Sequence, residues 1–539
     1  MSNWIKYFPH DKPRENQISA IDFAIDAFVN HEKRFVVIEA GTGVGKSAVG
    51  LTVTRYLQDY VPEDEEYQPG SYFLTTQKIL QDQYVHDFGG THGNMRSVKS
   101  SSNYQCRFHK KNTCAESLRT LKTADKSSSF FKTCVFRCVY KETKEEFIKS
   151  PCSVTNFPYF LAETNYAGKI KPRETLVIDE AHNVHNELSK FVEIVVTERF
   201  SKQALKLSMP VLNTQAQAIK WVRETYATKL FSHVKHMEKM LEKYIDLKEK
   251  LQEFTGLAKQ YELLDKHSCK LRRFLELYDK DNWVVNFVAA EGRSGRKIEF
   301  KPIDVAPYGE SMLFRLGKRA IMMSATILDI DGFCQTLGIE RDDVAFLSIP
   351  SPFETKNRPI IYCGIGSMSS KNIDNTLPQL AKAVQEILDN HSKEKGIIHC
   401  HTFRIANYLK RTIKDKRLIT HDSFNRDRVL EKHKKSKTPT VLLSPSMTEG
   451  IDLKDDTSRF QIICKIPYPY LGDKLIRKRM NKWKWWYPLQ TAKTIVQAAG
   501  RSVRNETDSA VTYILDSDWG FFYGKNMSFF PDDFRKCLL

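Results

Sequence analysis

The sequence predicts an α/β protein with two parallel sheets, and three observations lead to this fold class. Short β-branched runs recur along the chain, and polar segments of helical character separate many of them. Such alternation is typical of parallel α/β layers, because a helical crossover connects consecutive parallel strands. The chain has 539 residues, more than one hydrophobic core normally organises. Since the runs fall into two groups, we expect two α/β lobes.

The predicted strands define the two groups. The first group comprises residues 35–38, 72–75, 175–178 and 320–323, and the second comprises residues 396–399, 440–443, 461–464 and 511–514. Two regions depart from the pattern: residues 100–150 are rich in Cys, Lys and Ser without a clear strand, and residues 187–282 have a helical character. In the helical region, apolar residues recur at helical spacing at Val234, Met237, Leu241 and Tyr244. This stripe fits core packing better than a nucleic-acid-binding face.

Composition and charge narrow the class of protein. Apolar residues make up 41% of the chain, enough for packed cores, and no run approaches the roughly 20 apolar residues that span a bilayer. The N-terminal sequence lacks the apolar core of a signal peptide, so we expect a soluble, cytoplasmic protein. The formal net charge of +18 favours a polyanionic partner such as nucleic acid, although a generally basic surface would give the same number.

A glycine-rich segment after the first predicted strand has the features of a phosphate-binding loop. It reads A-G-T-G-V-G-K-S and departs from G-x4-G-K-[ST] only in its first residue. Glycines let backbone N–H groups wrap around phosphate oxygens, and the N-terminus of the following helix favours negative charge. Lys46 is expected to reach the β- and γ-phosphates and Ser47 to hold Mg²⁺. The expected loop residues are Ala40, Gly41, Thr42, Gly43, Val44, Gly45, Lys46 and Ser47.

A second apolar run, residues 175–178, ends in two carboxylates within the sequence D-E-A-H. Asp179 is expected to hold Mg²⁺, and Glu180 to orient and activate the attacking water. In isolation this sequence could start an ordinary helix. Together with the upstream loop, it predicts an enzyme that hydrolyses a nucleoside triphosphate.

The order and separation of the motifs resemble those of superfamily 2 helicases. After the loop and D-E-A-H come S-A-T at residues 324–326 and Q-A-A-G-R-S-V-R at residues 497–504. The resemblance implies two RecA-like lobes with ATP bound between them. Arg501 and Arg504 lie three residues apart, so in a continuous helix they would share one face. As arginine fingers they would stabilise charge on the transferring γ-phosphoryl group from the opposite lobe.

Further residues narrow the resemblance to the XPD/DinG-type helicases. Y-F-P at residues 7–9, followed by Arg14 and Gln17, resembles the adenine-side motif of that group, in which Phe8 or Tyr7 would stack on adenine. L-T-T-Q at residues 74–77, S-P-F at residues 351–353 and S-M-T-E-G-I-D at residues 446–452 fit the same group. The resemblance adds Phe8, Arg14, Gln17, Gly450, Asp452 and Gln497 to the expected ATP site, and Thr75, Thr76 and Thr448 to the expected contacts with the nucleic-acid backbone.

Four cysteines between the phosphate loop and D-E-A-H form a candidate metal centre. Cys106, Cys114, Cys134 and Cys138 have the spacing C-x7-C-x19-C-x3-C. Four thiolates can hold a [4Fe–4S] cluster or tetrahedral zinc, and spacing alone does not decide between them. The family resemblance favours the iron–sulfur cluster. A fifth cysteine, Cys152, lies in a strand-like segment, and we interpret it as a packing residue.

The resemblance also implies a domain organisation for the chain. We expect the first RecA-like lobe in residues 1–100, 151–186 and 283–335, the iron–sulfur insertion in residues 101–150, a helical arch insertion in residues 187–282 and the second RecA-like lobe in residues 336–539.

One basic and aromatic stretch is a candidate nucleic-acid surface. Between residues 474 and 486 the sequence combines Lys474, Arg477, Lys478, Arg479, Lys482 and Lys484 with Trp483, Trp485 and Trp486. Basic residues would contact phosphates, and aromatic faces can stack on bases. A solvated helix with its aromatic side buried explains the stretch equally well.

The sequence therefore predicts an ATP-dependent DNA helicase that uses ATP, Mg²⁺ and a [4Fe–4S] cluster, with zinc as the alternative metal. Its expected partners are single-stranded and forked DNA, on which it works as a monomeric motor, and the resemblance implies 5′→3′ movement. Two other functions fit the sequence less well. A nucleic-acid-binding scaffold with an inactive ATP site does not explain the complete set of catalytic residues, and the cysteine insertion does not suit an RNA helicase.

Overall fold

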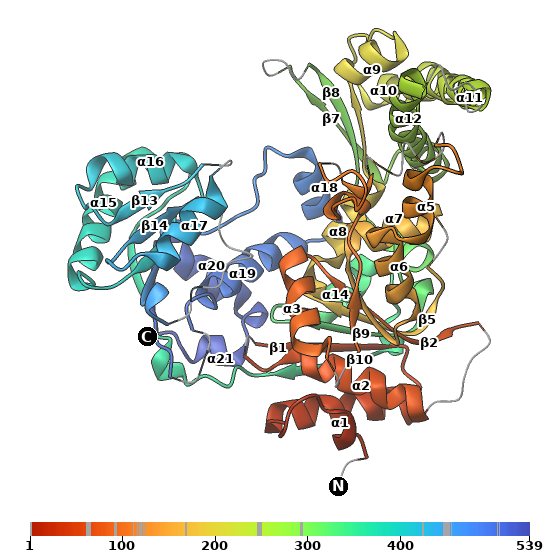
Figure 1. The fold of residues 1–539 in the computed structure, drawn as a ribbon. Helices are drawn as coiled ribbons and strands as arrows, with labels where there is room; N and C mark the ends of the chain where they lie inside the picture. The colour runs from red at the N-terminus through yellow and green to blue at the C-terminus, as the bar shows by residue number, and fades with distance from the viewer. Residues whose placement is uncertain are drawn as a thin grey trace.

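A computed structural model shows two parallel β-sheets and a third, antiparallel sheet (Figure 1). The structure describes residues 3–41, 43–60, 66–90, 94–111, 113–115, 117, 121, 124–167, 170–244, 251–290, 295–422, 425–445, 453, 455–503, 505 and 507–539. Within these ranges no helix is both long and apolar enough to cross a membrane.

The first sheet forms the core of the N-terminal lobe, with all neighbouring strands parallel. Its order is β10 (Val344–Ile349), β1 (Phe35–Ala40), β9 (Gly317–Ser324), β5 (Arg173–Asp179), β2 (Gln68–Thr75), β4 (Cys152–Asn156) and β3 (Arg96–Ser97). Alternate residues of β1 enter different core clusters, with Val37 on one side of the sheet and Val36 on the other. The strand is buried on both faces, which explains its uninterrupted apolar run.

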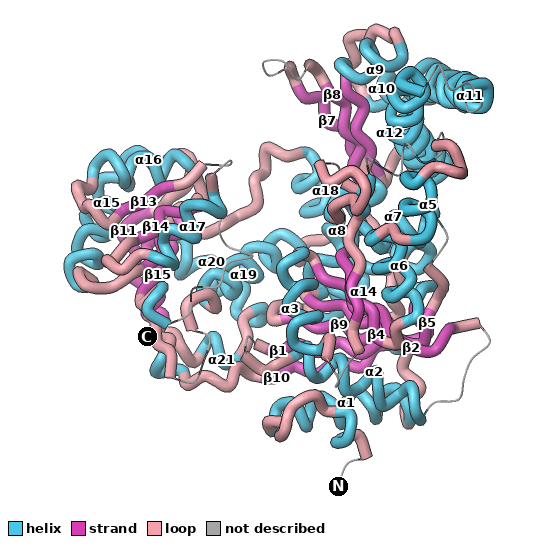
Figure 2. Tube along the Cα trace, viewed as in Figure 1, coloured by secondary structure: helices cyan, strands magenta, loops and turns pink. Residues whose placement is uncertain are grey.

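Helices cover both faces of this sheet, as the tube in Figure 2 shows. They are α1 (Glu15–Val29), α2 (Lys46–Tyr60), α3 (Lys78–Phe88), α7 (Phe157–Ala162), α8 (Val184–Val192), α13 (Ala306–Met312) and α14 (Ile330–Leu337).

The second sheet is also parallel and lies in the C-terminal lobe, in the order β11 (Ile360–Gly366), β16 (Val511–Asp516), β15 (Phe460–Ile463), β12 (Gly396–His399), β14 (Val441–Ser444) and β13 (Leu418–Thr420). The helices between and after these strands in the sequence are α15 (Ile373–Asn390), α16 (Phe403–Thr412), α17 (Arg426–Lys435), α18 (Lys474–Lys482), α19 (Trp486–Ala499), α20 (Asp518–Asn526) and α21 (Asp532–Arg535). Each of the eight predicted strands overlaps a strand of these two sheets, so the expected pair of α/β lobes is confirmed.

The expected boundary between the lobes at residue 336 is wrong. Strand β10 pairs in parallel with β1, Val344 opposite Phe35, and so belongs to the first sheet. The chain passes to the second sheet only between Ile349 and Ile360. Strand β10 joins the sheet as an edge strand beside β1, a placement that depends on pairing across more than 300 residues of sequence.

The expectation of an all-helical arch insertion in residues 187–282 is wrong, because a third sheet forms part of this region. This sheet is antiparallel and has the strand order β6 (Ile194–Thr197), β8 (Lys297–Pro302) and β7 (Trp283–Val288). The segment expected to be helical thus contains the strand β6. Strand β8, assigned to the first lobe, pairs with β6, and β7, also assigned to that lobe, pairs with β8. The predicted helices are present as α9 (Glu198–Leu205), α10 (Gln215–Trp221), α11 (Ala227–Tyr244) and α12 (Leu251–Leu277). Val234 and Met237 lie in the core, which confirms packing as their role.

The cysteine-rich insertion is mainly helical in its second half. Helix α5 (Ser129–Phe136) carries Cys134, and Cys138 is the residue that precedes α6 (Val139–Lys149). Helix α6 packs against β3 and β4, which fixes the insertion to the edge of the first sheet.

Candidate nucleotide site between the lobes

The phosphate loop connects β1 to α2 with backbone conformations that favour glycine. Gly43 and Gly45 have φ angles of 87° and 80°, values that residues with a Cβ rarely adopt. The Nζ atom of Lys46 donates hydrogen bonds to the carbonyl oxygens of Ala40 at 3.0 Å and Gly41 at 3.4 Å. The loop is therefore wrapped around the lysine that would bind phosphates. Thr42 lies outside the described residues.

The start of α1 lies against this loop. Arg14 donates to the Gly43 carbonyl oxygen at 2.6 Å, and Gln17 donates to that of Gly45 at 3.5 Å. The structure thus places both residues against the backbone of the phosphate loop, and their contact with ATP stays a prediction.

The two aromatic residues expected at adenine are placed differently. Phe8 and Tyr7 are both buried and lie outside the lining of the cleft between the lobes as the structure describes it. The Tyr7 hydroxyl donates to the Asp59 carboxylate on α2, and the Phe8 ring packs edge-to-face on His10. Stacking of either ring on adenine stays a prediction.

The carboxylates of D-E-A-H lie at the C-terminal end of β5, beside a tyrosine that sequence reasoning missed. The Tyr84 hydroxyl donates to Asp179 Oδ2 at 3.2 Å and lies within hydrogen-bonding reach of Ser47. Burial and the charge of Glu180 raise the pKa of Asp179 to about 6. Tyr84 therefore joins the two residues expected to hold Mg²⁺. It belongs to none of the recognised motifs, so nothing in the sequence marked it.

Glu180 has the left-handed backbone conformation, with φ of 51° and ψ of 47°. This conformation is uncommon for a residue other than glycine and costs free energy that the surroundings must offset. It directs the chain from β5 into the following turn, and one carboxylate oxygen lies 3.4 Å from His182 Nδ1.

His182 connects the motifs of both lobes. Its Nε2 atom accepts hydrogen bonds from the side-chain amides of Asn183 at 3.0 Å and Gln497 at 3.1 Å, which places the ring proton on Nδ1. Nδ1 lies 2.8 Å from Ser324 Oγ. Burial lowers the pKa of His182 to about 4, consistent with a neutral ring. Gln497 also donates to Thr326 Oγ1 at 3.0 Å, so one residue of the second lobe contacts two motifs of the first.

The facing motifs enclose a cleft of about 1040 Å³. Gly41, Glu180 and His182 line it from the first lobe, and Gln497 and Arg501 line it from the second. The structure thus brings together the phosphate loop, the expected general base and one expected arginine finger. Gly450, Asp452 and Arg504 lie outside the described residues.

Two charged side chains near this cleft, the buried Glu39 and the half-buried Lys493, were not expected from the sequence. Glu39 of β1 accepts from the Leu328 backbone N–H at 2.7 Å and from Ser348 Oγ at 3.0 Å. Lys493 of α19 faces it from the second lobe, where burial lowers its pKa to about 8 while the carboxylates of Glu39 and Asp329 act in the opposite direction. This pair of opposite charges adds an electrostatic attraction between the lobes.

The S-P-F segment of the interlobe linker lies directly on the phosphate loop. A Cβ atom added to Gly43 would lie 2.5 Å from the ring of Phe353, and the Cβ atom of Ser351 lies 3.4 Å from the Cβ position of Gly41. Asp533, near the C-terminus, accepts from the Ser351 backbone N–H at 3.3 Å and from Arg358 at 3.0 Å. The linker is thereby held between the loop and the C-terminal segment.

The four candidate cluster ligands converge on one small cavity. Cys106, Cys114, Cys134 and Cys138 are all buried and line it together. Burial raises the pKa of Cys114 and of Cys134 to about 11. Among the described residues, no group of three or more His, Cys, Asp or Glu side chains is arranged to hold a single metal ion.

Cys152 lies away from that cavity, in strand β4. It is buried within a core cluster of the first lobe, and Ser71 Oγ donates to its sulfur at 3.7 Å. Its interpretation as a strand residue that packs in the core is confirmed.

The expected nucleic-acid contacts differ in exposure. Thr75 is buried and its hydroxyl donates to the Gln77 carbonyl oxygen at 3.1 Å, whereas Thr76 is half-buried and lines the cleft. Thr448 lies outside the described residues.

The basic and aromatic stretch on α18 packs against the third sheet. Trp483 and Trp486 are buried, and the equally buried Arg479 donates to the carbonyl oxygens of Ile303 and Pro302. Lys482 forms an ion pair with Asp304. Trp483, Trp486 and Arg479 are therefore packing residues, as the interpretation of a helix with a buried aromatic side predicts. The basic side chains of the stretch that stay exposed are Lys474, Arg477, Lys478, Lys482 and Lys484.

A phosphate loop, a carboxylate pair and an arginine thus meet across two parallel-sheet lobes, which is the arrangement of a two-lobed fold of the RecA-like class. Two family comparisons agree with this class. The family described as "Helicase C-terminal domain" matches residues 386–527, and "Type III restriction enzyme, res subunit" matches residues 10–210.

Two individual proteins with similar sequences are both named as DNA helicases. The chain is 26% identical over 239 residues to ATP-dependent DNA helicase DinG of Photobacterium profundum, covering 41% of this chain and 34% of that protein. It is 22% identical over 431 residues to ATP-dependent DNA helicase YoaA of Haemophilus influenzae, covering 70% of this chain and 66% of that protein. The matches thus span between about a third and two thirds of these relatives.

Solved structures share the whole fold. The structure named XPD_Helicase superimposes with a TM-score of 0.63 at 17% identity, covering 96% of this chain and 98% of the other. An apo XPD structure gives a TM-score of 0.58, also at 17% identity, with 94% and 98% covered. Taken with the sequence matches, these structures confirm the resemblance to XPD/DinG-type superfamily 2 helicases that the sequence motifs indicate.

Proposed function

We propose that this protein is an ATP-dependent DNA helicase that translocates on single-stranded DNA and separates duplex strands. One observation carries the proposal: residues of both lobes line a single cleft, and Gln497 of the second lobe donates a hydrogen bond to His182 of the first. A change in the contents of the cleft would therefore act on both lobes at once. The names of the DinG and YoaA relatives support DNA as the substrate.

The chain's own residues supply the steps of hydrolysis. The phosphate loop would bind the triphosphate, with Lys46 exchanging its carbonyl partners for the β- and γ-phosphates. Ser47 and Asp179 would hold Mg²⁺, which when bound neutralises phosphate charge. Glu180 would accept the proton of the attacking water. Arg501 and Arg504 would stabilise charge on the γ-phosphoryl group, and Gly450 and Asp452 would complete the ATP site.

The nucleic-acid path is proposed from family position and charge. Thr75, Thr76 and Thr448 would contact the backbone of the bound strand, which positions a strand without reading its sequence. The net charge of +18 supports binding to single-stranded and forked DNA. The resemblance implies movement in the 5′→3′ direction, and we propose that the motor is monomeric.

ATP turnover and strand separation test this function. We expect single-stranded DNA to stimulate ATP turnover in the wild type, and a forked duplex to be unwound only when ATP is present. Lys46→Ala should abolish both activities, because the loop loses the charge that binds the phosphates. Stimulation by RNA in place of DNA would indicate an RNA helicase instead. DNA binding without turnover in the wild type would indicate a scaffold with an inactive ATP site.

We further propose that Cys106, Cys114, Cys134 and Cys138 hold a [4Fe–4S] cluster, with zinc as the alternative. Support comes from their convergence on one buried cavity, although they are spread over 33 positions of sequence. A set of four thiolates is the usual donor set for such a cluster. Helices α5 and α6 carry or border two of the four, so the cluster would fix these helices against the edge of the first sheet.

Metal content in single cysteine variants tests this centre. Wild-type protein purified without oxygen should contain about four iron atoms per chain. Cys134→Ser should lose iron and unwinding while keeping basal ATP turnover, because the nucleotide cleft is formed elsewhere. The matched control is Cys152→Ser, which should keep its iron because Cys152 packs in the core of the first lobe. Zinc in the wild type would contradict the cluster, and iron loss in the control would contradict the ligand set.

A further inference from the structure

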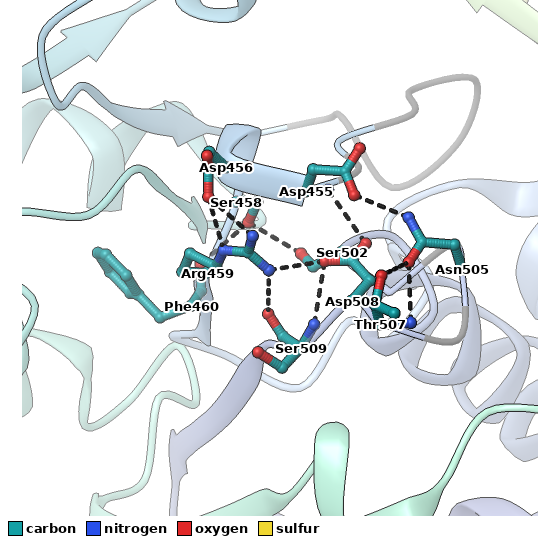
Figure 3. Close-up of polar contacts among 10 residues, drawn as sticks. All are labelled: Asp455, Asp456, Ser458, Arg459, Phe460, Ser502, Asn505, Thr507, Asp508 and Ser509. Atoms are coloured by element: carbon teal, nitrogen blue, oxygen red, sulfur yellow. Dashed lines mark hydrogen bonds and ion pairs between the residues drawn. The ribbon is translucent and has the colours of Figure 1, made fainter.

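The loop that carries Arg501 is anchored at its far end by a buried carboxylate, Asp508 (Figure 3). Asp508 Oδ1 accepts hydrogen bonds from Arg459 at 2.8 Å and from the Ser509 backbone N–H at 3.0 Å. Its Oδ2 accepts from the backbone N–H of Asp455 at 3.0 Å. Both oxygens are therefore engaged, each by a residue of the segment before β15.

Further hydrogen bonds join the same two segments. Ser502 Oγ donates to Ser458 Oγ at 2.8 Å, and Asn505 donates to the Asp455 carboxylate at 2.7 Å. Ser502 and Asn505 directly follow Arg501 and Arg504 in the sequence. The segment from Asp455 to Arg459 is thus attached to the chain immediately after each proposed arginine finger.

The Arg459 guanidinium bridges two carboxylates of very different exposure. The side chain of Asp508 is fully buried, whereas that of Asp456 is 95% exposed. Exposed ion pairs contribute little, because water screens them and the side chains lose conformational freedom. Removing one partner of a buried pair leaves an uncompensated charge and is strongly destabilising. The Arg459–Asp508 ion pair should therefore hold the loop in place more strongly than the Arg459–Asp456 ion pair does.

Asp455 has an unfavourable backbone conformation that these hydrogen bonds stabilise. It has a φ angle of 56°, in the left-handed region that residues with a side chain rarely adopt. The hydrogen bond from its backbone N–H to Asp508 and the one that its carboxylate accepts from Asn505 hold it there. Loss of Asp508 would remove the first of these bonds and the partner of Arg459 together.

We propose that Asp508 is a positioning residue for ATP hydrolysis. It holds residues 455–459 against the loop after α19 and so sets the backbone from which Arg501 reaches the cleft. This role rests on the proposed function. Asp508 does not line the cleft, so it acts through the loop and not on the nucleotide.

The test compares two substitutions that each remove one carboxylate from Arg459. Asp508→Asn should lower kcat about 10-fold with a change in the KM for ATP of no more than about 2-fold, because a charge-assisted hydrogen bond that orients a catalytic group is lost. Amide hydrogen exchange should rise in peptides covering residues 453–459 and 500–509. Asp456→Asn should leave both measurements at wild-type values.

A second variant guards against misfolding. Arg459→Gln removes the same pair from the other side and should reproduce the loss of kcat. Unchanged kcat in Asp508→Asn with raised exchange would overturn the positioning role, and so would equal losses of kcat in Asp508→Asn and Asp456→Asn. A wild type that hydrolyses no ATP would instead overturn the proposed function, and the role of Asp508 with it.

Discussion

Glu180→Gln should bind ATP and lose nearly all of its hydrolysis, with turnover falling by a factor on the order of 10²–10⁴, the usual contribution of a general base. The amide has almost the same shape as the carboxylate but cannot accept the proton of the attacking water. It can keep the left-handed backbone of Glu180, so the cleft should stay intact. Steady-state ATP turnover with saturating single-stranded DNA is the measurement, alongside titration with a fluorescent nucleotide.

An exposed glutamate far from the cleft provides the control. Glu224 lies among the helices around the third sheet, so Glu224→Gln should behave like the wild type in both assays. Turnover near the wild-type level in Glu180→Gln would contradict the assignment of the base. Nucleotide affinity that falls together with turnover would point to a binding role for the carboxylate.

Arg501→Ala should lower ATP turnover by about 10³-fold while nucleotide affinity falls much less, because an arginine finger acts mainly on charge that develops in the transition state. Arg501 lines the same cleft as Glu180, but from the opposite lobe. We expect a loss of the same order for Arg504→Ala. Turnover and equilibrium binding should be measured on the same preparations of each variant.

The exposed Arg411 at the end of α16 offers a matched loss of positive charge. Arg411→Ala should keep wild-type turnover, which separates the local role of Arg501 from a general change in charge. If affinity and turnover fall by the same factor in Arg501→Ala, the residue makes a ground-state contact instead.

Elements with strong local signals were predictable from the sequence. Strands such as β1 and β5 are buried on both faces, so they appear as uninterrupted apolar runs that need no knowledge of their neighbours. The phosphate loop and D-E-A-H were recognisable because each is a short contiguous motif that follows such a strand. The contact of Gln497 with His182 agrees with motifs of one site lying in both lobes.

Other features depend on pairing between distant segments. Strand β10 is a short apolar run after a helix, and only its pairing with β1 assigns it to the first lobe. The basic and tryptophan-rich stretch at α18 was equally consistent with a nucleic-acid surface. Only the structure showed that Trp483, Trp486 and Arg479 pack in the interior, where Arg479 donates to the carbonyl oxygens of Ile303 and Pro302. Tyr84 and Asp508 have no sequence signature, because their roles arise from neighbours far away in the chain.

By itself the sequence determined the pair of α/β lobes and located the phosphate loop and the two carboxylates proposed to act in catalysis, since local periodicity and contiguous motifs encode these features. Only the tertiary structure decided that the lobe boundary follows Ile349, that residues 283–302 join the insertion, and that four cysteines share one cavity. It also decided which side chains support the site from outside the motifs, Tyr84 and Asp508 among them. The physical reason is that burial, strand pairing and hydrogen-bond partners are properties of the folded chain as a whole, and residues far apart in sequence supply them.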